Sequence, residues 1–321
     1  MTGVPTTCLV VGEAPASLDR GRIAAIPDVD FVPFANAGPH LSEVEVALVW
    51  DFRWGGLGEV LQHATRLRWV HAGSAGVDHL LPALAARPDV TLSNSTGVFE
   101  RPIAEYVLGL VLAHAKGFPE TARAQSERRW AYRETAGLAG ATLVVIGAGR
   151  IGTAIAELAA AVGLRVVGVR RRAPEGDANP PFARLVGSAH LASAVADADF
   201  VVIATPATSE TAQLVDARVL GWLRPSAYLV NIGRGLAVDV AALAAVLRAG
   251  SLAGAALDVF EDEPLPPESP LWTVPNLFIS PHMSADVTGW ADGILKLFAA
   301  NLAAWRAGRP LAGIVDRSRG Y

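Results

Sequence analysis

A glycine-rich turn, with G-x-G-x-x-G at residues 147–152, constrains the possible folds of this chain more than any other feature. An apolar run precedes it and an Ala-rich stretch follows it, which predicts a buried strand, a tight turn and a helix. In that setting Gly147 permits the turn, Gly149 lets the backbone approach a pyrophosphate, and Gly152 lets the helix pack on the strand. The helix N-terminus offers N–H groups to the phosphates. The segment therefore predicts a dinucleotide site, with a ligand-free turn as the alternative. The residues expected to contact the cofactor here are Gly147, Gly149, Arg150, Ile151 and Gly152.

The end of the next predicted strand should distinguish between the two nicotinamide cofactors. Proteins that bind NAD usually place an acidic residue about 20 residues beyond the glycines, where it holds the ribose 2′-hydroxyl. Here the strand ends in Arg170, Arg171 and Arg172, with no acidic residue among them. Guanidinium groups suit a 2′-phosphate by charge and by geometry. The pattern favours NADP(H) over NAD(H), with Arg170 and Arg171 as contacts, and a solvated basic loop is the alternative.

Apolar runs alternate with Ala- and Leu-rich segments along the chain, which is typical of parallel sheets with helical crossovers. The second series of runs predicts a doubly wound dinucleotide-binding domain. A long helical segment from about Pro102 to Glu127 separates the two series, and Pro119 is expected to break or kink it. The predicted strands are Thr7–Gly12, Val46–Trp50, Arg68–Ala72, Val90–Ser93, Thr142–Ile146, Arg165–Val169, Phe200–Ala204, Ala227–Ile232, Gly254–Val259 and Leu277–Ser280. Further predicted segments are helices at Glu59–Thr65, Ile151–Val162, Val240–Ala249 and Ala285–Ala307 and a surface loop at Arg172–Pro181.

Length and composition narrow the class of protein. With 321 residues the chain is longer than one core usually supports, so two domains are expected. It is 51% hydrophobic and 18% charged, which argues against disorder. A net charge of −4 argues against a nucleic-acid partner, and no apolar stretch is long enough to predict a membrane span. The N-terminus lacks the basic start of a secretory signal, and the one cysteine, Cys8, fits a reducing compartment, so the cytoplasm is expected. No Cys/His spacing predicts a metal site.

Several motifs in one order resemble the D-isomer-specific 2-hydroxyacid dehydrogenases, most closely the glyoxylate/hydroxypyruvate reductase branch. They run over nearly the whole chain, and their combination is far more specific than any one motif. Besides the glycine turn, they are residues 71–78 (HAGSAGVD), 101–106 (RPIAEY), 205–206 (TP), 231–235 (NIGRG), 258–264 (DVFEDEP) and 280–282 (SPH).

The resemblance implies a fold of two doubly wound parallel-sheet domains, in which a Rossmann coenzyme domain is inserted in a discontinuous flavodoxin-like substrate domain. Residues 1–102 plus 283–321 would form the substrate domain, and residues 103–282 would form the coenzyme domain. It also implies a homodimer through the coenzyme domain. The segment Phe118–Leu138, which includes Trp130, is similar to the family's dimer arm.

Three residues are expected to carry the chemistry. His282 follows the last predicted strand, and histidine can release a proton to a carbonyl near neutral pH. A lone histidine among seven is usually structural, but the Ser-Pro-His context and the resemblance select this one. The resemblance also selects Glu263 from an acidic loop as the carboxylate that favours the protonated imidazole. Arg234, between two glycines at a strand end, suits the substrate carboxylate through a forked pair, although a surface arginine is the alternative.

Weaker site predictions surround these three. Ala75 and Gly76 lie in a small-residue loop whose N–H groups could bind the substrate carboxylate. By resemblance, Asp258 approaches the nicotinamide carboxamide. Ser284 departs from the family, because many members have glycine there, and this leaves the local backbone contact with the nicotinamide open. The remaining expected cofactor contacts are Thr205 and Pro206 on the adenosine side and Ile232.

The sequence therefore predicts an oxidoreductase that transfers hydride between NAD(P)H and a small 2-oxoacid or D-2-hydroxyacid. Two alternatives stay open. One is another dehydrogenase on the same frame, such as a phosphite dehydrogenase. The other is a dinucleotide-sensing binding protein similar to the corepressors that resemble this family, which would not be expected to need a matched acid/base pair such as Glu263 and His282.

Overall fold

The computed structural model describes residues 5–12, 20–51, 53–172 and 180–320, and it divides the chain into two compact units. Unit 1 is Met1–Phe99 with Val287–Tyr321, and unit 2 is Glu100–Asp286. The chain enters unit 2 at the first residue of α4 (Glu100–Ala115). The boundaries expected from the sequence, 102/103 and 282/283, fall a few residues inside unit 2. Seven residues of the expected loop at 172–181, namely 173–179, lie outside the described residues.

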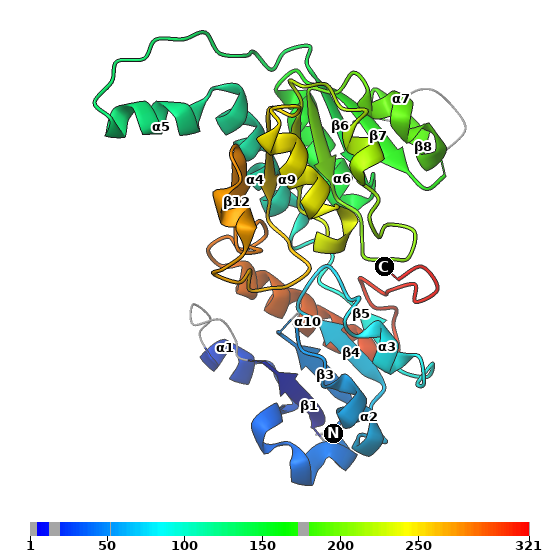
Figure 1. Cartoon of the computed structure of the whole chain (residues 1–321). Coiled ribbons are helices and arrows are strands. Elements are labelled where there is room, and N and C mark those ends of the chain that lie inside the picture. Colours follow the sequence, from blue (N-terminus) through cyan, green and yellow to red (C-terminus); the bar gives the residue numbers. More distant parts are fainter. Residues whose placement is uncertain (1–4, 13–19, 52, 173–179, 321) are drawn as a thin grey trace. The chain divides into compact units, whose positions relative to one another are not determined.

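Unit 1 contains a five-stranded sheet in the order β2-β1-β3-β4-β5, in which all neighbouring strands are parallel (Figure 1). This 2-1-3-4-5 order is the flavodoxin-like form of the doubly wound fold. The strands are β1 Thr6–Val11, β2 Val29–Pro33, β3 Val46–Val49, β4 Trp69–Ala72 and β5 Thr91–Ser93. The helices are α1 Arg20–Ala24, α2 Leu57–His63, α3 Leu81–Leu84, α10 Trp290–Arg306 and the 3-10 helices η1 Phe34–Asn36 and η2 Gly38–Glu43.

The C-terminal helix α10 belongs to unit 1 because its apolar side packs on that unit's sheet. Phe298 is fully buried and stacks on Trp69 of β4 with ring centroids 5.3 Å apart. At the end of the helix, the Arg306 Nε atom donates to Thr6 Oγ1 at 3.1 Å. Burying two large aromatic side chains in this way stabilises the sheet by several kcal/mol in rough terms. The unit is therefore built from both ends of the chain.

Unit 2 contains a seven-stranded parallel sheet in the order β12-β11-β10-β9-β6-β7-β8 (Figure 1). Counted from β6, this is the Rossmann order 3-2-1-4-5-6 with one further strand, and β6 and β9 meet at the switch point where such sheets bind ligands. The strands are β6 Thr142–Ile146, β7 Arg165–Arg170, β8 Arg184–Gly187, β9 Phe200–Ile203, β10 Tyr228–Asn231, β11 Gly254–Leu257 and β12 Leu277–Ile279. The remaining helices are α5 Phe118–Ser126, α6 Arg150–Ala161, α7 Leu191–Val195, α8 Ala217–Leu220, α9 Val240–Arg248 and the 3-10 helices η3 Ser188–His190, η4 Gly235–Ala237 and η5 Pro270–Thr273.

The predicted doubly wound α/β fold is confirmed, but the sequence missed two strands and the break between two helices, and the helix expected at Ala285–Ala307 begins only at Trp290. Both missed strands, β2 and β8, lie at an edge of their sheet and are partly exposed, so neither is a continuous apolar run. The segment expected to be one long helix is two, α4 and α5. Gly117, with φ +60°, separates them, and Pro119 lies in the first turn of α5, where its missing N–H removes no hydrogen bond.

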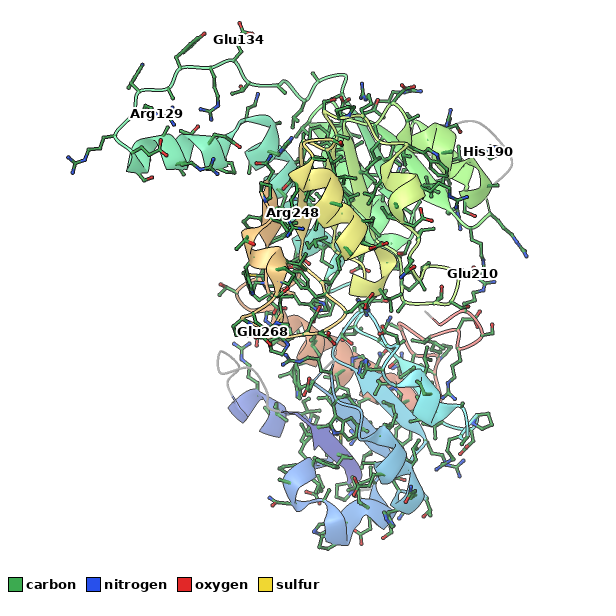
Figure 2. All side chains as sticks on the ribbon, in the orientation of Figure 1. Arg129, Glu134, His190, Glu210, Arg248 and Glu268 are labelled. Atoms are coloured by element: carbon green, nitrogen blue, oxygen red, sulfur yellow. The ribbon has the colours of Figure 1, made fainter. Side chains whose placement is uncertain are left out.

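An arm extends from unit 2 and consists of α5 and the stretch that follows it to Leu138. Figure 1 shows this arm leading away from the sheet, and Figure 2 shows the side chains of Arg129 and Glu134 along it. Two aromatic side chains on the arm are almost fully exposed, Trp130 at 98% and Tyr132 at 88%. Large aromatic side chains in solvent usually mark an interaction surface.

Within the described ranges, no helix is both long enough and apolar enough to cross a membrane.

Candidate active site

The predicted site residues of unit 2 lie at or shortly after the carboxyl ends of six strands of its sheet, including Arg170 and Arg171 at the end of β7. Gly147 follows β6, and Thr205 lies just beyond β9. Arg234, Asp258 and His282 follow β10, β11 and β12 in the same way. Because all seven strands are parallel, these turns gather along one edge, which is where doubly wound sheets bind their ligands.

The glycine-rich turn has the shape that a pyrophosphate site needs. Gly147 has φ +105°, and a Cβ atom on it would stand 2.5 Å from the Ala204 carbonyl oxygen, so a side chain is excluded there. A Cβ atom on Gly152 would overlap the carbonyl of Gly147. Gly149 differs, because a Cβ atom on it would have no described atom within 4 Å. Backbone N–H groups at the start of α6 therefore border space into which a phosphate fits.

Thr205 supplies a second observation in favour of a dinucleotide. Its Oγ1 atom is buried and has no hydrogen-bond partner among the described residues. Buried hydroxyl groups are normally paired, so this one indicates an absent ligand or water. Gly233 leaves no room for a side chain beside it, since a Cβ atom would stand 2.7 Å from the Thr205 carbonyl oxygen. These residues fit a nicotinamide dinucleotide.

The other predicted cofactor contacts have partners of their own or lie at the surface. The Arg150 Nε atom donates to Glu100 Oε1 at 2.9 Å, which joins the start of α6 to the start of α4. Arg170 ends β7 and is exposed. Arg171 lies 3.5 Å from Glu210, and both side chains are at least half exposed, so this ion pair adds little to stability. Three further predicted contacts are partly or fully buried next to these turns: Ile151, Pro206 and Ile232.

Glu263 and His282 form the central pair of the site. The His282 Nδ1 atom lies 2.8 Å from Glu263 Oε2. The second carboxylate oxygen, Oε1, accepts the backbone N–H of Phe260 at 2.9 Å. An ionised carboxylate can only accept, so the His282 Nδ1 atom carries the hydrogen of this bond. The side chains are 28% and 18% exposed, which leaves the pair partly open to a ligand.

The charge state of Glu263 follows from opposing effects. Burial raises the pKa of its carboxyl group, because a buried charge loses hydration. The hydrogen bonds from His282 and Phe260, and the positive charge of Arg234, together outweigh burial and hold the pKa of Glu263 below its usual value. Glu263 is therefore ionised at neutral pH. The influence of Arg234 also shows that the three residues predicted to carry the chemistry share one electrostatic environment.

A buried asparagine fixes the turn that carries Arg234. The Asn231 Nδ2 atom donates to the Arg234 carbonyl at 3.0 Å, and Asn231 Oδ1 accepts the N–H of Gly233 at 3.1 Å. Gly235 brings the turn against the loop of Glu263, because a Cβ atom on it would overlap the backbone of Phe260. The guanidinium is half-buried and donates from NH1 to the Gly233 carbonyl at 2.8 Å. Its position at a strand end suits a carboxylate ligand.

Asp258 holds the backbone on both sides of His282. Its Oδ1 atom accepts Ser280 Oγ at 2.6 Å and the N–H of Met283 at 3.0 Å. Its Oδ2 atom accepts the N–H of Ser284 at 2.9 Å. His282 between them has φ +54°, a conformation that non-glycine residues rarely adopt. The carboxylate, which is 2% exposed, therefore stabilises the turn that presents the imidazole.

In unit 1, Ala75 and Gly76 lie in the loop that follows β4. The N–H groups of these two residues donate to no acceptor among the described residues. Two adjacent unpaired N–H groups can bind a carboxylate.

Sequence reasoning assigned no role to several polar residues that position these turns, notably Asn231, Ser280, Asn94 and Ser95. The first two lie inside the quoted motifs at 231–235 and 280–282. The motifs therefore include these residues but do not show that their side chains hold the turns. A hydrogen bond between neighbouring strand ends depends on which strands are neighbours. The strand order, which the periodicity does not give, would have been needed to find them.

Comparison with known proteins identifies the family. The model of the family described as "D-isomer specific 2-hydroxyacid dehydrogenase, NAD binding domain" matches residues 108–284, which lie within unit 2. The glyoxylate reductase of Thermococcus gammatolerans is 33% identical over 270 residues, and the match covers 81% of this chain and 79% of that protein.

Solved structures agree over nearly the whole chain. A D-isomer specific 2-hydroxyacid dehydrogenase family protein from Aeromonas salmonicida is 34% identical with a TM-score of 0.85, covering 97% of this chain and 99% of that one. The NADPH-dependent glyoxylate/hydroxypyruvate reductase of Sinorhizobium meliloti, solved with NADP and sulfate, is 27% identical with a TM-score of 0.86. The match covers 98% of this chain and 100% of that one. The protein therefore belongs to the D-isomer specific 2-hydroxyacid dehydrogenase family and is a dehydrogenase that binds a nicotinamide dinucleotide.

Proposed function

We propose that this dehydrogenase works as a reductase of small 2-oxoacids, with glyoxylate and hydroxypyruvate as its first candidate substrates and NADPH as its preferred cofactor. The observation that carries the proposal is the 2.8 Å pair of His282 and Glu263 at the carboxyl edge of the unit 2 sheet. Two relatives named above support the substrate class, since one is a glyoxylate reductase and the other a glyoxylate/hydroxypyruvate reductase.

His282 is proposed as the acid. The bound cofactor supplies the hydride that reduces the carbonyl carbon. His282 Nε2 gives a proton to the carbonyl oxygen, and takes one from the hydroxyl group in the reverse direction. Glu263 accepts from Nδ1, which fixes the tautomer and the orientation of the ring. Asp258 keeps the turn in the conformation that presents the ring and, as its family resemblance implies, approaches the nicotinamide carboxamide.

Arg234 is proposed to bind the substrate carboxylate and to polarise the neighbouring carbonyl. A guanidinium gives two parallel, charge-assisted hydrogen bonds to a carboxylate, which fixes both distance and orientation. The N–H groups of Ala75 and Gly76 are proposed to bind the same carboxylate. Unit 1 would then be the substrate domain and unit 2 the coenzyme domain. Positioning and charge stabilisation supply most of the rate enhancement in such a site.

The first experiment measures loss of NADPH or NADH absorbance with a panel of glyoxylate, hydroxypyruvate, pyruvate, phenylpyruvate and, in the oxidative direction, phosphite. Turnover of one or more oxoacids that collapses in His282→Ala supports the proposal. Turnover of phosphite alone would move the protein to the phosphite dehydrogenase alternative. Cofactor binding with no turnover of any compound would favour a dinucleotide-sensing protein.

The cofactor preference is tested separately at the end of β7. Arg170 and Arg171 are proposed to bind the 2′-phosphate of NADP(H), because two exposed guanidinium groups stand where NAD binders usually have an acid. Arg170→Ala with Arg171→Ala should raise the Kd for NADPH about 10-fold or more and leave that for NADH unchanged. Arg165→Ala, at the opposite end of the same strand, is the matched control. A wild-type preference for NADH would contradict the assignment.

We further propose that the protein is a homodimer and that the arm, with its exposed Trp130 and Tyr132, packs against a second copy. Light scattering during gel filtration should give twice the chain mass for the wild type and the single mass for Trp130→Ser with Tyr132→Ser. A wild type that is monomeric at micromolar concentration would contradict the proposal.

The compartment is proposed to be the cytoplasm, because the one cysteine, Cys8, is buried and the chain therefore needs no oxidising environment. Fractionation of cells should recover the reductase activity with cytoplasmic markers, and recovery outside the cytoplasm would contradict this.

A further inference from the structure

The loop that follows β4 has its carbonyl groups tied to the segment that follows β5. Ser95 Oγ donates to the Ala72 carbonyl at 2.8 Å, and the Ser95 N–H donates to the Ser74 carbonyl at 3.0 Å. Asn94 Nδ2 donates to the Ala75 carbonyl at 2.8 Å. Two consecutive residues, Asn94 and Ser95, thus supply one donor to the last residue of β4 and two donors to the loop that follows it.

Because the peptide bond is planar, hydrogen bonds to these carbonyl groups also fix the directions of the neighbouring N–H groups. In a trans peptide, the carbonyl of one residue and the N–H of the next point in opposite directions. The bond to the Ser74 carbonyl therefore fixes the direction of the Ala75 N–H. The bond from Asn94 to the Ala75 carbonyl fixes the Gly76 N–H in the same way. These are the two N–H groups that have no acceptor among the described residues.

Asn94 is itself held in one orientation. Its Oδ1 atom accepts the N–H of Thr96 at 3.2 Å and Thr96 Oγ1 at 2.6 Å, so Nδ2 is the end of the amide that faces Ala75. The backbone N–H of Asn94 donates to the Gly313 carbonyl at 2.9 Å. The side chain is 8% exposed, so water cannot easily replace the donor that it gives to the loop.

Ser95 is held by a buried chain of hydrogen bonds with one direction. Trp69 Nε1 donates to Ser93 Oγ at 2.8 Å, so the Ser93 hydroxyl hydrogen is free to donate to His71 Nδ1 at 2.8 Å. His71 Nε2 then carries the ring hydrogen toward Ser95 Oγ at 3.4 Å, and Ser95 donates onward to Ala72. Each hydroxyl both accepts and donates, and the chain ends on the carbonyl of Ala72, the last residue of β4.

We propose that Asn94 is a positioning residue for substrate binding, which aims the Gly76 N–H at the substrate carboxylate through its bond to the Ala75 carbonyl. The backbone N–H of Ser95 does the same for the Ala75 N–H through its bond to the Ser74 carbonyl, and His71 and Ser93 hold the Ser95 side chain in place. The inference rests on the proposed function, since it needs the loop to bind a carboxylate. Asn94 touches neither substrate nor cofactor in this role, and its effect passes through one peptide bond.

The expected kinetic result is a change in KM without a comparable change in kcat. The carboxylate is the same group in the ground state and in the transition state, so a weaker N–H contact removes uniform binding. Asn94→Ala should raise KM for glyoxylate about 10-fold, keep kcat within about 3-fold, and leave the Kd for NADPH unchanged. Ser95→Ala is the second variant; it keeps the backbone donor to Ser74 and removes only the hydroxyl bond to Ala72 that holds Ser95 in place, so KM should rise in the same direction but by less.

Thr96→Val is the matched control. It removes one bond on the acceptor side of the same amide and leaves the donor to Ala75 in place, so KM should change less than about 3-fold. A general loss of local structure would instead affect Asn94→Ala and Thr96→Val alike, and would lower kcat along with the melting temperature. Equal KM values in Asn94→Ala and the wild type would overturn the proposal.

A binding measurement separates this inference from the proposed function. Calorimetry with oxalate, on protein saturated with NADP⁺, reports carboxylate affinity without turnover. If the wild type binds oxalate but reduces no acid, the proposed function fails, and a Kd about 10-fold weaker in Asn94→Ala still supports the positioning role. If oxalate binds both proteins equally, the positioning role is wrong. If oxalate binds neither, the positioning role is wrong, and the turnover assay alone decides the proposed function.

Discussion

The proposed catalytic turn of unit 2 (residues 280–284, called the catalytic turn below) and the proposed carboxylate-binding loop of unit 1 (residues 73–76, called the carboxylate loop below) are held in place by different chemistry. Around His282 the acceptors are two carboxylates, Asp258 and Glu263, and the bonds are charge-assisted. Around Ala75 the donors are the neutral side chains of Asn94 and Ser95 and one backbone N–H. Both loops follow strand ends, and each is braced from a neighbouring loop.

The difference matches what each loop is proposed to do. A residue that gains and loses a proton benefits from a nearby negative charge, because the charge stabilises its protonated form. A loop that binds a carboxylate would lose affinity beside such a charge, so neutral donors hold it without repelling the ligand. The comparison therefore predicts that variants of the catalytic turn change kcat and respond to pH, whereas variants of the carboxylate loop change KM.

The largest expected effect comes from removing the acid. His282→Ala should lower kcat by about 10²–10⁴-fold, because proton transfer to the carbonyl oxygen loses its donor, while KM changes little. Steady-state kinetics with NADPH and glyoxylate measure both constants. A variant that keeps more than a tenth of the wild-type kcat would show that another group supplies the proton.

The next effect distinguishes the two proposed carboxylate contacts. Arg234→Ala should lower kcat/KM for glyoxylate by about 100-fold, with losses in both constants, because a guanidinium both binds the carboxylate and polarises the carbonyl. Arg234→Lys should recover only part of this, since lysine lacks the forked geometry. A change in KM alone would mean that Arg234 contributes only to substrate binding, as Asn94 is expected to, and would contradict the predicted difference between the two loops.

A smaller effect is expected from the brace of the catalytic turn. Asp258→Asn replaces one acceptor oxygen with a donor that faces a hydroxyl group or a backbone N–H. The free energy of unfolding should fall by about 2 kcal/mol, measured by urea denaturation, and kcat should fall with it. Ser280→Ala removes only the hydroxyl donor and serves as the milder control. A stable Asp258→Asn protein with unchanged kcat would contradict the bracing role.

The smallest effects concern stability in acid. The contributions of His71 and Glu263 to the free energy of unfolding should be lost over different pH ranges. Burial lowers the pKa of His71 from 6.5 to about 3, so this residue stabilises the neutral folded state fully above pH 6.5 and loses that contribution as pH falls toward 3. The pKa of Glu263 is lowered, so its contribution is complete above its ordinary value of 4.5 and is lost only below it.

Urea denaturation between pH 7 and 5 tests this difference. His71→Gln should flatten the decline in stability over that range by about 1 kcal/mol, whereas Glu263→Gln should leave it unchanged. The opposite result would mean that the carboxylate, and not the buried imidazole, titrates there.

The sequence allowed the fold and the positions of the candidate residues at the strand ends to be predicted, but little of what holds those residues in place. The glycine turn and the Ser-Pro-His motif can be found in the sequence, because Gly147 and His282 follow apolar runs and belong to specific motifs. The predicted sheets also follow from period and crossover length. The hydrogen bonds that hold those residues depend on the strand order, which the sequence pattern does not give. The edge strands β2 and β8 were missed because a half-exposed strand has only a weak hydrophobic pattern.

Asn94 and Ser95 illustrate the limit of such reasoning. In the sequence they read as turn residues after a short strand, some twenty residues from the loop that they hold. Only the pairing of β4 with β5 brings the two segments together. A hydrogen bond to a backbone carbonyl does not depend on the residue type of the acceptor, so the sequence does not show that Ala72 and Ala75 accept these bonds.

The side chains in the buried series of hydrogen bonds from Trp69 to Ser95 are neutral, so the arrangement that they hold should not depend on ionic strength. Dissolved salt screens charged groups over about 8 Å at 0.15 M, but it has little effect on hydrogen bonds among neutral buried groups. The arrangement of the Ala75 and Gly76 N–H groups should therefore stay the same from dilute buffer to concentrated salt. Any rise of the substrate KM with a weakly binding salt then measures the share of carboxylate binding that is due to the charge of Arg234.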